Sequence, residues 1–129
     1  MHKYLTVLDG GTVLWGDDLH PVPAARLLID DTRVGRLLQP DEDLPDGAQV
    51  VDCDGCTVLP GLIDTHCHLT LPGDGRDVDR FLVQANDDEL IRIGLQNAHR
   101  ALRGGVTTLR DLGARGWTGF EVVRQLADG

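Results

Sequence analysis

Residues 59–68 read Leu59-Pro60-Gly61-Leu62-Ile63-Asp64-Thr65-His66-Cys67-His68. A short apolar run that follows a Pro-Gly pair and ends in polar residues is typical of a buried strand leading into a loop. Alternate side chains of a strand point to one face, so we expect Asp64, His66 and His68 to lie together. Thr65 and Cys67 are expected on the opposite face. Two imidazoles at this spacing, roughly 7 Å apart along a strand, can tilt toward one cation, so the motif predicts a metal site.

The residues before this stretch predict an all-β module. Asp9-Gly10-Gly11 separates two apolar runs, which is typical of a hairpin turn, and residues 30–32 form a second turn signal. Residues 39–47, rich in proline and acidic residues, predict an exposed loop. No helical periodicity occurs in this part of the chain. Strands are expected over residues 4–8, 12–15, 26–29, 34–38, 49–52 and 57–59.

The hydrophobic period changes after residue 60. Residues 87–103 predict a helix, because apolar residues recur there at helical spacing and form one stripe, at Ile91, Leu95, Ala98 and Leu102. Acidic residues begin this segment, and arginines and two glycines end it, as helix termini favour. A Gly- and Asp-rich loop is expected over 71–79, a strand over 106–110 and a helix over 120–127. This alternation of strands and helices predicts an α/β fold with a parallel sheet.

Composition excludes several classes of function. The chain has 12 basic and 21 acidic residues among 129, a net charge of −9, so it lacks the clustered positive charge that nucleic-acid binding requires. No apolar run approaches the roughly 18 residues of a membrane span, and the first residues do not form a signal peptide. Three cysteines are too few for a secreted disulfide framework. We therefore expect a cytoplasmic protein that binds neither nucleic acid nor membrane.

Two segments of the chain resemble the amidohydrolase superfamily of metal-dependent hydrolases. The first runs from residue 50 to residue 69 and contains the Pro-Gly pair and the His-x-His motif. The second runs from Asn97-Ala98-His99-Arg100-Ala101-Leu102 to Gly105-Val106-Thr107-Thr108-Leu109-Arg110-Asp111-Leu112-Gly113 and is similar to the imidazolonepropionase-like and prolidase-like branch. The resemblance implies that residues 1–59 are the N-terminal part of a small β-sandwich. Residues 60–129 would be the first two βα units of a (β/α)8 TIM barrel.

The resemblance also implies roles for individual residues. His66 and His68 would bind one or two divalent metal ions, with zinc expected, at the C-terminal end of the first barrel strand. Asp64 would orient one imidazole, or would simply be the polar end of the strand. Arg110 and Asp111 would approach the site from the second strand. Since only one of two adjacent strand residues can point inward, the choice between them stays open.

The implied activity is hydrolysis of an amide, dipeptide-like or related carbon–nitrogen bond by a metal-activated water. The superfamily pattern further requires a carboxylated lysine or a glutamate, two histidines and an aspartate from later strands. Lys3 precedes the β-module and His99 falls within the predicted helix, so neither fills these positions. A barrel takes about 250 residues. We therefore expect a second polypeptide that supplies the rest of the barrel, in a hetero-oligomer that assembles further, acting on a small-molecule substrate.

Other readings use the same residues differently. Cys53 and Cys56 with His66 and His68 would form a Cys2His2 zinc site in a non-catalytic binding or β-sandwich interaction module. The chain would alternatively be a fragment without activity in isolation. Cys67 is most simply a small buried hydrophobic residue. The acidic residues of the 71–79 loop are more typical of a solvated loop than of a calcium site.

Overall fold

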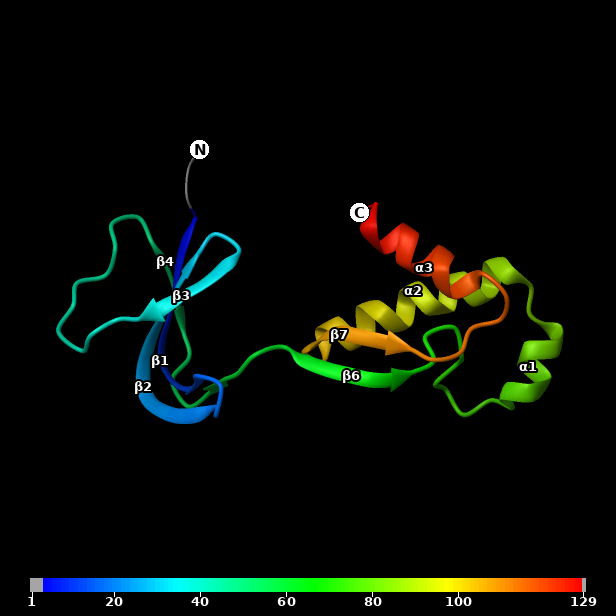
Figure 1. The fold of residues 1–129 in the computed structure, drawn as a ribbon, viewed down its shortest axis with the longest axis horizontal. Coiled ribbons are helices and arrows are strands. Elements are labelled where there is room, and N and C mark those ends of the chain that lie inside the picture. Colours follow the sequence, from blue (N-terminus) through cyan, green and yellow to red (C-terminus); the bar gives the residue numbers. More distant parts are fainter. Residues whose placement is uncertain (1–3, 129) are drawn as a thin grey trace. The chain divides into compact units, whose positions relative to one another are not determined.

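The computed structural model describes residues 4–128, which fall into two compact units with the boundary along the chain between Pro60 and Gly61 (Figure 1). The first unit contains five strands: β1 (Leu5–Trp15), β2 (His20–Asp30), β3 (Arg33–Leu37), β4 (Gln49–Asp52) and β5 (Thr57–Val58). The second contains β6 (Leu62–Cys67), α1 (Val78–Gln84), α2 (Asp87–Arg103), β7 (Val106–Asp111) and α3 (Thr118–Ala127). The mixed α/β composition agrees with the prediction. No helix among residues 4–128 is long and apolar enough to cross a membrane.

The first unit is a sheet built around β1. Its order is β3-β2-β1-β4, and β5 also pairs with β1. The β1–β2 and β2–β3 pairs are antiparallel, whereas β4 and β5 run parallel to β1. The small core contains Val13, Ala25 and Leu27. The predicted turn at 30–32 and the strands around it, and those near 49–52 and 57–59, are confirmed.

The predicted hairpin turn at Asp9-Gly10-Gly11 is wrong. β1 continues through these residues, and its register against β2 shifts on either side of Gly11, as at a β-bulge. Gly10 has a φ of +85°, which the bulge requires. A Cβ atom on Gly11 would lie only 3.0 Å from the Cβ of Cys53. The glycines therefore make room for a neighbouring turn, and the chain reverses later, over residues 16–19.

The second unit places helices against a pair of parallel strands. β6 and β7 form a two-stranded sheet, and Leu69, Ala98 and Val122 form a core that joins this sheet to α2 and α3. The helix predicted over 87–103 is confirmed with those bounds. Its N-cap is Asn86, whose side chain accepts the backbone N–H of Glu89 at 2.8 Å. α3 begins at residue 118, two residues before the predicted start.

Two features of this unit differ from the prediction. The short helix α1 was not expected, because its seven residues give too few turns for a clear period; it is capped by Asp77 and buries Phe81. The buried residues of α2 are Leu90, Ile93, Gly94 and Ala98. Leu102, assigned to the apolar stripe, is 59% exposed, while Ile91 and Leu95 are half-buried. The buried face is displaced because α2 packs against both α1 and α3.

Candidate functional site

The two histidines of the predicted metal site come together where β6 ends. The ring centroids of His66 and His68 lie 5.3 Å apart, with the rings edge to face at 84°. Both residues are exposed. Two imidazoles that lie this close together and remain open to solvent are suitable donors for a divalent cation. The juxtaposition predicted from their spacing is confirmed.

The prediction that Asp64 and Cys67 lie on opposite faces is wrong. Asp64 pairs with Leu109 of β7, and Cys67 pairs with Asp111. Between these two pairs β6 advances by three residues and β7 by two, so β6 contains one extra residue. This extra residue reverses the alternation of side chains. Asp64 and Cys67 therefore share one side, where both line a cavity of about 400 Å³ between the sheet and α2, and His68 also lines this cavity. The Asp64 carboxylate accepts the backbone N–H of His66 at 3.0 Å, so it holds the strand rather than an imidazole ring.

Cys67 is a packing residue beside the site. It lies against the core of Leu69, Ala98 and Val122, and its thiol donates to the Arg110 carbonyl at 3.5 Å. Burial raises the pKa of this thiol, and the nearby negative charges of two aspartates add to the effect. The side chain is therefore held protonated, which is consistent with its reading as a small hydrophobic residue.

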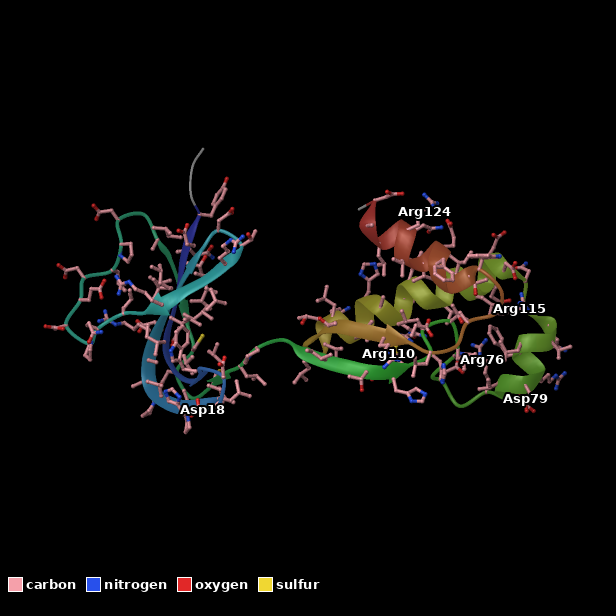
Figure 2. All side chains as sticks on the ribbon, in the orientation of Figure 1. Asp18, Arg76, Asp79, Arg110, Arg115 and Arg124 are labelled. Carbon is pink, nitrogen blue, oxygen red and sulfur yellow. The ribbon has the colours of Figure 1, made fainter. Side chains whose placement is uncertain are left out.

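The structure separates the two candidates at the end of β7. Asp111 is half-buried; one carboxylate oxygen accepts the N–H of Gly113 at 3.0 Å, and the other is buried without a hydrogen-bond partner. This second oxygen lies near Gly119 in the first turn of α3. Arg110 is exposed and alternates with Leu109 and Asp111, so it lies on the face of β7 away from the helix-side core (Figure 2). Of the pair, Arg110 is thus the residue on the open face of the sheet.

The loop after β7 approaches His68 closely, which the sequence did not reveal. A Cβ atom on Gly113 would lie 3.0 Å from Nδ1 of His68. Arg115, two residues further on, donates to the carbonyls of Leu82 and Ala85 at 2.8 and 2.9 Å and pairs with Asp87 at 2.6 Å (Figure 2). These bonds fasten the loop to the junction of α1 and α2. An arginine followed by glycine in a loop carries no sequence signal for such a role.

The donors present fit part of a metal site. Among residues 4–128, no group of three or more His, Cys, Asp or Glu side chains comes close enough to hold an ion. In the loop before α1, Asp74 pairs with Arg76 at 2.5 Å and Asp77 caps the helix. The two imidazoles thus supply half of the four ligands usual for zinc.

Comparison with known proteins identifies the family. Residues 57–129, more than half of the chain, match the model of the amidohydrolase family. The chain belongs to the amidohydrolase family. This confirms the resemblance seen in the motifs around the His-x-His pair and the second strand.

Individual proteins agree with this assignment. The chain is 34% identical over 131 residues to a dihydropyrimidinase of Rattus norvegicus, covering 95% of the chain and 22% of that protein. It is 30% identical over 120 residues to an imidazolonepropionase of Myxococcus xanthus, covering 71% and 28%. A solved prolidase complexed with N-methylphosphonate-L-proline is 30% identical with a TM-score of 0.71, covering 94% and 29%. The chain therefore spans between about a fifth and three tenths of these proteins.

Proposed function

We propose that this chain is one part of a metal-dependent amidohydrolase that hydrolyses an amide, dipeptide-like or related carbon–nitrogen bond. The observation that carries the proposal is the pair of exposed imidazoles, 5.3 Å apart, at the end of β6. Active sites of parallel βα barrels form at the C-terminal ends of the strands, which is where this pair lies. The names of the related proteins support the reaction class. They include hydantoinase and dihydropyrimidinase.

His66 and His68 would hold one or two divalent ions, with zinc the expected metal. When bound, such an ion supplies Lewis acidity, which polarises a substrate carbonyl and lowers the pKa of the attacking water. Catalytic zinc usually has three protein ligands, and the described residues bring together only two. The remaining ligands, for which the family resemblance implies a lysine or glutamate, two histidines and an aspartate, would come from elsewhere in the assembly.

The surface of the second unit supports completion by further βα units. On the face of β6 and β7 away from the helix-side core, Ile63 is 67% exposed. On α3, Phe120 and Val123 are 69% and 63% exposed. A sheet of only two parallel strands with one uncovered face is unusual, because parallel sheets are normally covered on both faces. Each strand also has an unpaired edge, which folded proteins usually pair or protect. We propose that a second polypeptide supplies the rest of a (β/α)8 barrel, covers these surfaces, and forms a higher oligomer with this chain.

Arg110 would bind the substrate in such a barrel. Its guanidinium lies on the open face of β7, which becomes the interior when further strands close the sheet. A planar guanidinium pairs with a carboxylate through two parallel hydrogen bonds. We propose that Arg110 orients a small-molecule substrate that carries a carboxylate beside its scissile bond. Asp111 would instead hold the loop that borders His68.

Metal analysis of paired variants tests the ligand assignment. In the protein assembled with its completing polypeptide, His66→Ala/His68→Ala should remove most of the bound zinc, because both imidazole donors are lost. The matched variant Cys53→Ser/Cys56→Ser should retain it. Elemental analysis after gel filtration measures both. Loss of zinc in the cysteine variant alone would favour the zinc-binding module instead.

The proposed partner is tested separately, by native mass spectrometry of the purified protein and an amidase assay with and without the larger chain. We expect the 14.0 kDa chain in a complex with a larger polypeptide, and activity only in that complex. A monodisperse 14.0 kDa monomer with full hydrolytic activity would contradict the proposal.

A further inference from the structure

Two cysteines occupy the ends of one tight turn in the first unit. The turn joins β4 to β5, and the N–H of Cys56 donates to the carbonyl of Cys53 at 2.9 Å. Gly55, in the third position, has a φ of +71°, as a type II turn requires. Such a turn keeps its first and fourth Cα atoms within about 7 Å, and disulfides span Cα separations of about 4.4–6.8 Å. The backbone therefore holds the two residues at a separation that a disulfide can bridge.

Both ends of this turn are fixed to the same strand. The N–H of Cys53 donates to the Asp9 carbonyl at 2.7 Å, and the N–H of Thr12 donates to the Cys56 carbonyl at 3.0 Å. Between these anchors lies Gly11, where a Cβ atom would approach both the side chain and the carbonyl of Cys53 to 3.0 Å. The turn is thus seated on the β1 bulge. It cannot widen without breaking bonds to β1.

The two thiols differ in access to solvent. Cys56 is exposed and Cys53 is half-buried, and both are free. An exposed cysteine at one end of a fixed turn with a second cysteine at the other end is an arrangement in which one cysteine can react first and the other resolve the product. The chain's third cysteine, Cys67, lies in the other unit among core side chains. The proposed metal site uses none of these sulfur atoms.

We propose that Cys53 and Cys56 form a reversible dithiol site, which a small-molecule disulfide of the glutathione type oxidises to an intramolecular disulfide. The Cys56 thiolate attacks one sulfur of the small disulfide, forms a mixed disulfide and releases one small thiol. The Cys53 thiolate then attacks the Cys56 sulfur, which forms the protein disulfide and releases the second small thiol. Two protein thiols are oxidised and one small disulfide is reduced to two thiols. The product is a side-chain cross-link between the two ends of the turn that joins β4 to β5.

The experiment uses the full chain with Cys67→Ser, equilibrated with mixtures of reduced and oxidised glutathione, acid-quenched and examined by mass spectrometry. We expect the loss of two hydrogen atoms, mapped to a peptide with Cys53 joined to Cys56. The folded chain should form this bond with an equilibrium constant at least about tenfold higher than the same chain in concentrated urea, because the turn is preorganised. Cys53→Ser should stop at the mixed disulfide on Cys56.

Further variants test the role of the turn. Gly11→Ala pushes against Cys53 and should lower the equilibrium constant toward the value in urea. Gly73→Ala, whose added Cβ meets nothing within 4 Å, should leave it unchanged. Equal constants in folded and unfolded chains, or a mixed disulfide on Cys56 that persists while Cys53 is free, would overturn the proposal. The urea comparison and Cys53→Ser decide the question even where Gly11→Ala fails to fold.

Discussion

Gly94 of α2 is a position where one added methyl group should have a large effect on the second unit. A Cβ atom there would lie 2.6 Å from Cγ2 of Val122 in α3 and 3.4 Å from Cγ2 of Thr70, two residues after His68. Val122 is fully buried and its β-branched side chain has little rotamer freedom, so the overpacking should cost about 2–3 kcal/mol. Alanine in a helix gains about 1 kcal/mol over glycine. Gly94→Ala should therefore destabilise this unit by about 1–2 kcal/mol.

The sign of this effect should reverse when Val122 is shortened. Val122→Ala alone should cost about 2–3 kcal/mol, through lost burial and a cavity. In that background the close contact with Val122 Cγ2 is gone, and Thr70 Cγ2 at 3.4 Å is an ordinary van der Waals neighbour. The added methyl group of Gly94→Ala should therefore stabilise the unit by about 1 kcal/mol. The coupling energy between the two sites is then about 2–3 kcal/mol.

Urea unfolding followed by far-UV circular dichroism measures these changes, because the helices of residues 4–128 all lie in the second unit. Gly73→Ala, placed where the added atom meets nothing within 4 Å, is the matched control and should change the free energy of unfolding little. The same sign for Gly94→Ala in both backgrounds would refute the packing argument.

Three further predictions concern the site and the charges. Gly113→Ala should displace His68, whose Nδ1 would lie 3.0 Å from the new Cβ; the imidazole NMR signals of His68 should shift, and unchanged signals would contradict the close approach. The hydrogen bond from Arg124 lowers the pKa of Glu121 from 4.5 to about 2, so its contribution to stability is complete above pH 4.5 and is lost as the pH falls toward 2. Glu121→Gln should therefore flatten the acid limb of the stability curve between these pH values, and an unchanged limb would show that the pair does not persist in solution. Burial raises the pKa of Cys67, so alkylation of its thiol at pH 8 should be slower in the folded chain than in urea, as timed mass spectrometry would show; equal rates would contradict its packing.

Local signals in the sequence were sufficient for most elements and for the histidine pair. The helix over 87–103 has a strong period and clear end signals, so its bounds agree with the structure. His66 and His68, at the end of β6 and just after it, come together because side chains two residues apart on extended backbone point the same way. In both cases the geometry depends on residues that are close together in the sequence. It can therefore be predicted without knowing which distant segments pack together.

The features that the sequence did not predict depend on pairing between distant segments. The position of Asp64 follows from an extra residue in β6 relative to β7, and no composition marks where that register shift occurs. The role of Arg115 follows from carbonyls about 30 residues away in the chain. The choice between Arg110 and Asp111 likewise required knowing which face of β7 packs on the helices. These are properties of tertiary contacts.

Three glycines show why residue type alone does not specify such contacts. Gly11, Gly94 and Gly113 each lie where another segment approaches the backbone so closely that a Cβ atom would be 3.0 Å or less from its nearest neighbour. The neighbours are a turn cysteine, a buried helix valine and a candidate metal ligand. Gly11 favoured a hairpin in the sequence analysis, because glycine is the usual residue both where a turn needs a positive φ and where another segment approaches the backbone closely. Only the neighbouring segment shows which of these two reasons applies at a given glycine. At Gly113 the neighbour is His68, so the backbone of the loop after β7 forms part of the wall around the proposed metal site.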